Sequence, residues 1–524
     1  MDPPSKTTHV TDIALTVTTS PVYDCAPQTN ESDKLPVELL VKIFGYVSGL
    51  CGSSHMDLSQ GPYVPKLHNL GQVCRRWLEI VKGTPKLWAF VTDLDPANVA
   101  LALDRSQSHP LGVAFAHMPL RRPLYATVLN HSQRWIRLDI RVSPREVEIL
   151  HGLEKVCAPV LQHLRLELST SNKNTTIILD LFRDHPPRLT SLALVGIAMH
   201  NWNSPIFGPH LHSLQLERIH TSGPTREDLR SILHTCPELA HLELAYVVFS
   251  DGSGGFPPLG PRVQLPLLHS LLLRPVSSAD AMDIARMAET PCCKNYLVSR
   301  GIESPDSIVF SAIVLQIQPL FEAYIASGCS LQVHLIGSWI RIRCRDGQSS
   351  SSSFILRFGK VGSCEKVLDW LNKILLVRRP PLSPIPVDVQ LNYTARWGSS
   401  SPSTDDLLRL SNVRSLTITD TYGCTVRLLN ALSIPTPPSD GCDRWLWPSL
   451  RKVNVSAFRG PSTVLLNMIK TRAEAALRRK KTGGMDGIVM LKKLEVGEDV
   501  FTFEEFEAVR AVLGNAAVMR HIDN

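Results

Sequence analysis

Few residues in this chain combine the types and the spacing that catalysis requires. A hydrolase needs a nucleophile beside a base and an oxyanion donor, and the sequence contains neither a GxSxG segment nor a recognisable Cys–His arrangement. His210 and His212 lie two residues apart, but no cysteine or carboxylate is spaced convincingly to complete a metal site with them. We therefore interpret both as outward side chains at the start of a strand, and we expect no enzyme activity, no metal and no cofactor.

Two further segments could in principle bind phosphate. Gly252–Gly255 precedes Phe-Pro-Pro rather than a helix, so its amides cannot line a helix N-terminus, and we interpret it as a loop. The cluster Arg478–Lys481 could be a nuclear localisation signal or a phosphate-binding patch. It also ends the helix-like segment Thr463–Leu477, where positive charge suits the helix dipole, and we favour this interpretation. Trp445 and Trp447 are expected to pack in a core.

The composition is that of an ordinary globular protein. The 524 residues exceed a single core and suggest a small module with a large scaffold, and 44% are hydrophobic and 20% charged. Twelve cysteines without a CxxC pair indicate reduced thiols. Residues 1–30 lack the apolar segment of a signal peptide, and no apolar run approaches the ~20 residues of a membrane helix. The net charge of +7 selects no partner. We expect a cytoplasmic or nuclear protein that binds neither membrane nor nucleic acid.

The elements that could position a binding surface begin near residue 33. Residues 1–32 are expected to be a disordered tail, since they lack periodicity and are rich in Pro, Thr and Ser. Pro36 suits the first turn of a helix and Glu38 complements its dipole, which predicts a helix over Val37–Val47. Its apolar residues form two sets, Leu39 with Ile43, and Leu40 with Phe44 and Val47. A helix that is apolar on two faces must be buried on two sides, which implies a partner surface.

A second helix is predicted over His68–Lys82, followed by an apolar plug at Leu87 and Trp88. Its apolar stripe consists of Leu70, Val73, Trp77 and Ile80. Gly83-Thr84-Pro85 would end this helix, and the polar, glycine-containing segment Ser48–Lys66 between the two helices is predicted to be a loop.

These segments resemble the F-box in content and order. The resemblance rests on Leu35–Leu40 with Ile43-Phe44, on Val73–Trp77 and on Thr84–Trp88, over about 55 residues. The loop Ser48–Lys66 is longer than in the compact F-box, which leaves the loop conformation open. The continuation is similar to the region after the F-box in mushroom-type fungal F-box proteins, at Leu103–Ser106, Pro110-Leu111 and His131–Trp135.

The resemblance implies a substrate-recognition subunit of an SCF-type ubiquitin ligase, a non-catalytic receptor in ubiquitin-dependent degradation. Its partners would be a Skp-type adaptor, a cullin bound through that adaptor, and a target protein of unknown identity. The residues expected to bind the adaptor or complete the module are Leu35, Pro36, Leu39, Leu40, Ile43, Phe44, Val73, Cys74, Trp77, Leu87 and Trp88. The alternative is a non-catalytic scaffold that binds the adaptor or other proteins without delivering a target to a ligase.

Downstream, a motif of the form LxxLxL recurs. It starts at Leu161, Leu189, Leu211, Leu239 and Leu268, with separations of 28, 22, 28 and 29 residues, around the range of leucine-rich repeats. Degenerate copies start at Val413, Leu450 and Leu491. Helical return segments are predicted at Arg226–His234 and Ala279–Ala288. Between residues 291 and 411 the period fails, and alternating strands are predicted at Leu331–Ile336, Trp339–Arg343 and Val387–Asn392.

The predicted fold is therefore a small helical F-box followed by an irregular, leucine-rich-repeat-like α/β solenoid. We place the F-box domain at residues 33–92, a connecting region at 93–159 and the scaffold at 160–524, with a break into two sub-arrays left open. Residues between the repeat leucines face outward, where a target could dock. We propose for that role His163, Arg165, Glu167, Gln215, Glu217, His241, Glu243, Leu272 and Arg274. For any one of them, an ordinary solvated strand residue is the competing interpretation.

Overall fold

The computed structural model describes residues 35–48, 63–92, 95–116, 122–169, 175–251, 261–276, 278–300, 314, 318–319, 321–322, 325, 330–336, 339–345, 353–359, 364–377, 386–393, 410, 412–420, 425–434, 445–456, 458–482, 488–497 and 500–520. The predicted tail at residues 1–32, most of the loop Ser48–Lys66 and the glycines of Gly252–Gly255 lie outside these residues. Chain contacts divide the protein into two compact units, Met1–Trp88 and Ala89–Asn524. Each unit is described by itself.

The first unit is helical. It consists of α1 (Val37–Ser48), α2 (Tyr63–Gly71), α3 (Arg75–Gly83) and the 3-10 turn η3 (Pro85–Trp88). The helix predicted over Val37–Val47 is confirmed as α1. One small core joins the elements, formed by Leu40, Phe44, Leu67, Ile80, Val81, Leu87 and Trp88.

The prediction of a single helix over His68–Lys82 is wrong, because the helix is interrupted before Cys74 and a new helix begins after it. The backbone of Cys74 is extended, with φ −159° and ψ 167°, and its Sγ accepts a hydrogen bond from the Trp77 amide at 3.5 Å, which caps α3. The supposed stripe is split: Val73 is 59% exposed while Ile80 is buried. α2 also starts within the predicted loop, at Tyr63, where Pro65 is tolerated in the first turn.

In the second unit the described residues form a seventeen-stranded, mostly parallel sheet that alternates with helices, as a leucine-rich-repeat-like α/β solenoid does. It begins with β1 (Phe90–Thr92), α4 (Pro96–Arg105), β2 (Leu111–Ala116), α5 (Arg122–Leu129), β3 (Trp135–Val142) and α6 (Glu148–His151). Residues 93–159, predicted as a connection, thus supply strands: β3 pairs with the first leucine repeat, Leu138 beside Leu164. Val113 and Phe115 fill the equivalent buried positions without leucine, which is why the leucine pattern misses them.

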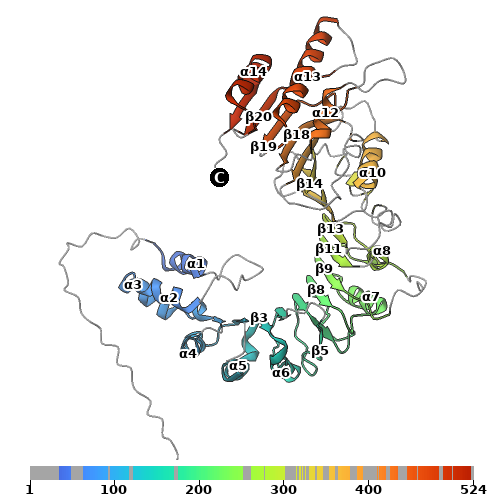
Figure 1. Ribbon diagram of the computed structural model, residues 1–524. Helices are drawn as coiled ribbons and strands as arrows, with labels where there is room; N and C mark the ends of the chain where they lie inside the picture. The colour runs from blue at the N-terminus through green and yellow to red at the C-terminus, as the bar shows by residue number, and fades with distance from the viewer. Residues whose placement is uncertain are drawn as a thin grey trace, which may run out of the picture. The chain divides into compact units, whose positions relative to one another are not determined.

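The five leucine repeats form adjacent parallel strands, as the motif predicts. They are β4 (His163–Leu168), β6 (Ser191–Val195), β8 (Ser213–Ile219), β9 (His241–Val247) and β11 (Ser270–Val276). Leu164, Leu192, Leu214, Leu242 and Leu271 stand side by side in register and are at most 4% exposed. The predicted helices are found as α7 (Arg226–Thr235) and α8 (Ser278–Met287), both on the same side of the strands (Figure 1).

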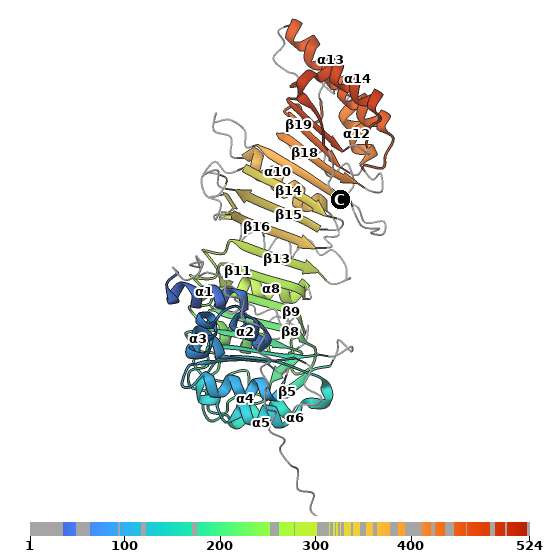
Figure 2. The ribbon, with the colours of Figure 1, turned by 90° about the vertical axis from the view of Figure 1, so that its left-hand side faces the viewer.

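The irregular segment keeps the sheet continuous by reversing one strand. β13 (Asn295–Arg300) pairs with β16 (Ser353–Gly359), β16 with β15 (Trp339–Arg345), β15 with β14 (Ser330–Ile336) and β14 with β17 (Val387–Tyr393). Only the two pairings that involve β15 are antiparallel among these four. The predicted strands are confirmed. The possible break into two sub-arrays is not found, since the strands run on without a gap (Figure 2).

The sheet ends with the degenerate repeats. They form β18 (Val413–Asp420), β19 (Lys452–Ser456) and β20 (Lys493–Gly497), followed by β21 (Ala517–Arg520), with helices α10 (Cys364–Val377), α12 (Val426–Ser433), α13 (Ser462–Thr482) and α14 (Phe503–Leu513). α13 ends at Thr482 with Arg478–Lys481 in its last turn, so the interpretation of this cluster as a helix end is confirmed, although the helix includes the cluster and does not stop at Leu477. Trp447 is buried, as expected, whereas Trp445 is only half-buried.

Short pairs complete the fold, β5 (Ile177–Leu179) with β7 (Ile197–Met199) and β10 (Val263–Gln264) with β12 (Ala288–Glu289). Among the described residues, none of the helices has the length and apolar character required to cross a membrane.

Candidate functional site

The two apolar sets of α1 have different fates in the first unit. Leu40 and Phe44 are buried at 1% and 0% exposure, and the Phe44 ring lies 4.7 Å from that of Trp77, centroid to centroid. Leu39 and Ile43, one position back along the helix, are 45% and 41% exposed. The unit therefore buries one side of α1 against its own helices and leaves the other side to solvent.

We call this second side the α1 face. It consists of five apolar residues that are between 36% and 66% exposed: Leu35, Leu39, Ile43, Tyr46 and Val47. Val37, at the start of α1, is 45% exposed but lies on the side of Leu40 and Phe44. Singly exposed apolar residues are ordinary, but a contiguous row on one helix is the signature of an interaction surface. In the described part of the unit, Val73 adds a seventh exposed apolar side chain, next to the start of α3.

Contacts within the unit hold the α1 face in place. The Arg76 guanidinium donates to the Leu35 carbonyl at 2.5 Å, which ties the start of α1 to α3. The Trp88 indole donates to the Val81 carbonyl at 2.7 Å, and this buried bond fastens η3 to the end of α3. A surface held on helices that are joined by such hydrogen bonds is pre-organised for a partner.

The structure divides the eleven residues expected to bind the adaptor. Leu35, Pro36, Leu39, Ile43 and Val73 are exposed, and Cys74 and Trp77 are half-buried. Leu40 and Phe44 lie in the core with Leu87 and Trp88, so their assignment as docking residues is corrected to a structural one. The set proposed as Leu40, Phe44 and Val47 is also split, since Val47 is 55% exposed. Tyr46 was missed, although it interrupts the polar side that a surface helix would need.

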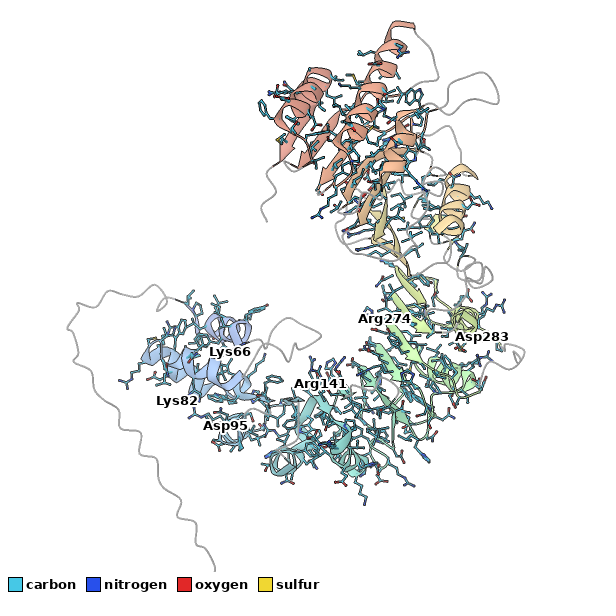
Figure 3. All side chains as sticks on the ribbon, in the orientation of Figure 1. Lys66, Lys82, Asp95, Arg141, Arg274 and Asp283 are labelled. Atoms are coloured by element: carbon cyan, nitrogen blue, oxygen red, sulfur yellow. The ribbon has the colours of Figure 1, made fainter. Side chains whose placement is uncertain are left out.

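A second surface lies on the face of the sheet opposite to the described helices, which we call the open face (Figure 1). Strand alternation puts the repeat leucines on the helix side and the residues between them on the open face. All nine residues proposed for target binding are at least partly exposed there. Arg141 and Arg274 project from this face, whereas Asp283, on α8, lies on the opposite side of the sheet (Figure 3).

Five polar side chains on β4 and β8 close a ring on the open face, which we call the polar ring. Arg165 donates to the Gln215 side-chain oxygen at 3.3 Å, and the Gln215 amide donates to Glu217 at 3.2 Å. Glu217 lies 3.9 Å from the Arg218 guanidinium, and Arg218 lies 3.5 Å from Glu167. Glu167 completes the ring by accepting from Arg165 at 3.0 Å.

Two local features let the ring span a whole strand. β6 lies between β4 and β8, and it places Ala193 exactly in register between Arg165 and Gln215. The methyl group leaves room for the hydrogen bond above it and is itself 8% exposed. Arg218 has φ +56°, in the left-handed region, which turns its side chain onto the same face as that of Glu217 although the two are neighbours in the chain.

The charges of the ring and of neighbouring β3 shift two carboxyl groups in opposite directions. Burial tends to raise the pKa of Glu167, but the hydrogen bond from Arg165 and the charges of Arg141, Arg165 and Arg218 outweigh it and hold the pKa below its ordinary value. For Asp139 burial dominates, so its pKa is raised despite the nearby charges of Arg165, Arg137 and Arg141. Glu167 is therefore a fixed anion, whereas Asp139 is a poorly solvated one.

Replacing Ala193 by leucine is expected to open the polar ring, because the longer side chain would occupy the space that Arg165 and Gln215 cross. Overpacking of this kind costs about 1–3 kcal/mol. Hydrogen exchange at the β6 amides measures it, with Ala193→Ser as the matched control that keeps the ring. Unchanged protection in Ala193→Leu would contradict the account of the ring.

Other residues that could do chemistry are not brought together. His210 and His212 lie 4.0 and 3.7 Å from the Glu238 carboxylate, on an exposed part of the surface. Within the described ranges, no three His, Cys, Asp or Glu side chains are grouped so as to hold a metal ion. What the structure assembles from the sequence is therefore two exposed surfaces, one apolar on α1 and one charged on the open face of the sheet.

Comparison with known proteins bears on the first unit. Residues 32–92 match the family model described as F-box-like, which covers all the helices of that unit. A search of curated proteins finds no match to the chain. The N-terminal part of this protein is an F-box-like domain, and the chain continues from it into a long, mostly parallel sheet alternating with helices.

Proposed function

We propose that this protein is the substrate-recognition subunit of an SCF-type ubiquitin ligase. The α1 face is the observation that carries the proposal: an F-box-like domain exposes a row of apolar side chains that its own core does not use. A Skp-type adaptor would cover this row and connect the chain to a cullin. Buried leucine and aromatic anchors at the centre of such interfaces commonly contribute 2 kcal/mol or more each.

In this proposal the chain accelerates ubiquitin transfer without reacting itself. The open face would hold the target, while another subunit supplies the reactive cysteine, so that catalysis comes from proximity. The polar ring supports this role because it presents fixed charges on a rigid sheet, which favours selective recognition over loose adhesion. The nine open-face residues, from His163 to Arg274, remain our proposal for the target-binding set.

The remaining features fit the same proposal. The leucine register from β4 to β11 supports a relationship to leucine-rich-repeat F-box proteins, and the residues after the F-box support the resemblance to mushroom-type fungal members. Residues 33–92 remain our proposal for the F-box domain, and we propose that the scaffold begins at Phe90 and includes residues 93–159. We expect the protein in the cytoplasm or the nucleus. If Arg478–Lys481 is a nuclear localisation signal, its removal should prevent import of the protein into the nucleus.

Affinity purification of the full chain from cells with the proteasome blocked tests the proposal. The expected result is recovery of a Skp-type adaptor, a cullin and one or more ubiquitinated proteins. Recovery of the adaptor without a cullin would favour the non-delivering scaffold instead. Recovery of neither, from a chain that is folded, would overturn the adaptor-binding role of the α1 face.

A further inference from the structure

One arginine on the open face differs from its neighbours. Arg137 on β3 stands in register beside His163 on β4, just as Asp139 stands beside Arg165 and Arg141 beside Glu167. Arg141 and Arg165 both form ion pairs with Glu167, at 3.2 and 3.0 Å. Across the described part of the chain, the Arg137 side chain forms no hydrogen bond or ion pair, and its charge acts at longer range on Asp139, Arg165 and His163.

Positive charge is in excess around Arg137. Four guanidinium groups, those of Arg137, Arg141, Arg165 and Arg218, lie near three carboxylates, those of Asp139, Glu167 and Glu217, and Glu217 lies 3.9 Å from Arg218. Glu167 already forms ion pairs with Arg141, Arg165 and Arg218, the last at 3.5 Å. Asp139 is 3% exposed and its raised pKa shows that burial outweighs the surrounding arginines. The local carboxylates therefore leave part of the positive charge uncompensated.

Among the described residues beside Arg137, the Asp139 carboxylate acts on the guanidinium electrostatically but forms no ion pair with it. On β2, Gly112 stands opposite Arg137 and Ala114 opposite Asp139, and neither has a polar side chain. On β4, the pKa of His163 is lowered by burial and then by the charge of Arg137, so a neutral imidazole faces the guanidinium. Burial lowers the pKa of Arg137 itself, as expected for a cation that has lost hydration without gaining a partner.

We infer that an acidic segment of a protein partner docks on β3 and β4, with a carboxylate of that segment bound by Arg137. The inference rests on the proposed function, since it names the chemistry of the target on the open face. A partner carboxylate would restore the hydrogen bonds that Arg137 lacks, in the two-pronged geometry that guanidinium and carboxylate groups share. The polar ring beside it stays rigid and needs no rearrangement for binding.

A nucleic acid fits this surface less well than an acidic protein segment does. Phosphates follow one another at regular short intervals, so a nucleic-acid site needs an uninterrupted positive track. Here Glu167, Glu217 and Glu243 interrupt the arginines of the open face between β4 and β9. Their carboxylates would repel a phosphate backbone, whereas a protein segment can place an acidic residue on Arg137 and neutral residues elsewhere.

Binding of labelled peptides to the purified full chain tests the inference. The probes are a short polyglutamate peptide, a polylysine peptide of the same length and a single-stranded oligonucleotide of matched charge. The wild-type chain should bind polyglutamate, more weakly as salt is added. Arg137→Gln should weaken this binding about tenfold, the loss of one charge-assisted contact. Arg183→Gln, a matched change at an arginine that is 75% exposed in the connection between β5 and β6, should leave it unchanged.

A second variant gives an effect of the opposite sign, which misfolding does not produce. Asp139→Asn removes the negative charge nearest to Arg137 and should strengthen polyglutamate binding a few-fold, while Arg137→Lys keeps the charge and should retain most of the affinity. The inference is overturned if polyglutamate does not bind at about 1 mM, if Arg137→Gln binds as wild type does, or if the oligonucleotide binds more tightly than polyglutamate. Adaptor binding, measured on the same preparations, tests the proposed function separately, because it depends on the α1 face.

Discussion

A chain carrying Leu39→Asp and Ile43→Asp should fold normally and fail to bind a Skp-type adaptor. Both side chains are more than 40% exposed, so the charges meet water in the free protein and cost little stability. In a complex the same carboxylates would be buried against an apolar surface without a partner charge. Each substitution would remove an apolar anchor worth about 2 kcal/mol of binding free energy and add the cost of desolvating a carboxylate. Titration calorimetry with purified adaptor should therefore show no measurable binding.

A matched control in the second unit carries the same chemical change. Leu267 is 45% exposed and Ile178 is 43% exposed, almost the same fractions as Leu39 and Ile43. Leu267→Asp with Ile178→Asp should leave adaptor affinity at the wild-type value. If this control also loses binding, or if the α1 variant retains it, then the α1 face is not the docking surface.

Leu40→Asp separates docking from folding. Leu40 is 1% exposed and packs in the core of the first unit, so a carboxylate there would be desolvated without a partner. This variant should lose the helical signal of the first unit as well as adaptor binding. A well-folded Leu40→Asp chain that selectively loses the adaptor would return Leu40 to the docking set.

Arg226→Met is expected to destabilise the middle of the sheet more than any change on the open face. Arg226 is the first residue of α7 and lies 2.8 Å from Asp251, 2.6 Å from Asp280 and 2.8 Å from Asp283. Its side chain is 14% exposed and that of Asp283 is 2% exposed. Without the guanidinium, three carboxylates would face one another with little water. Breaking a buried ion pair on one side costs about 3–5 kcal/mol.

Hydrogen exchange at the α7 and α8 amides measures this loss locally, which suits a solenoid that need not unfold in one step. The loss should shrink as the pH falls. Burial raises the pKa of Asp283 above its ordinary value, even with Arg226 beside it. The folded state therefore binds this proton more tightly than the unfolded chain, so acid favours folding at this site and rising pH opposes it. Removal of Arg226 should raise the pKa of Asp283 further and so widen the pH range over which acid favours folding at this site.

The matched comparison is Arg274→Met, which removes an arginine that is 46% exposed and forms one ion pair with Glu243 at 3.1 Å. An exposed pair of this kind contributes about 1 kcal/mol or less. Equal effects of Arg226→Met and Arg274→Met, or an effect of Arg226→Met that grows in acid, would contradict the assigned role of the aspartate cluster.

Much of the architecture is determined by local patterns. The leucines at positions such as 164, 192 and 214 repeat with the strand period, and only one register lets them all be buried, so the parallel strands from β4 to β11 could be predicted. The same holds for α1 and for α7, whose start is marked by the capping box of Thr225 and Asp228. These signals depend on residues that are close together in the sequence, so they can be recognised without the tertiary structure.

Long-range packing decided the rest. Whether Leu39 or Leu40 faces the core depends on where α3 and η3 lie, which no periodicity in α1 records. The polar ring depends on Ala193 lying between two strands that are fifty residues apart at Arg165 and Gln215. The sequence by itself determined that α1 has more apolar residues than one buried face needs and that a sheet with buried leucines follows. Only the tertiary structure decided which of them remain exposed for a partner, because burial depends on contacts with residues far away in the sequence.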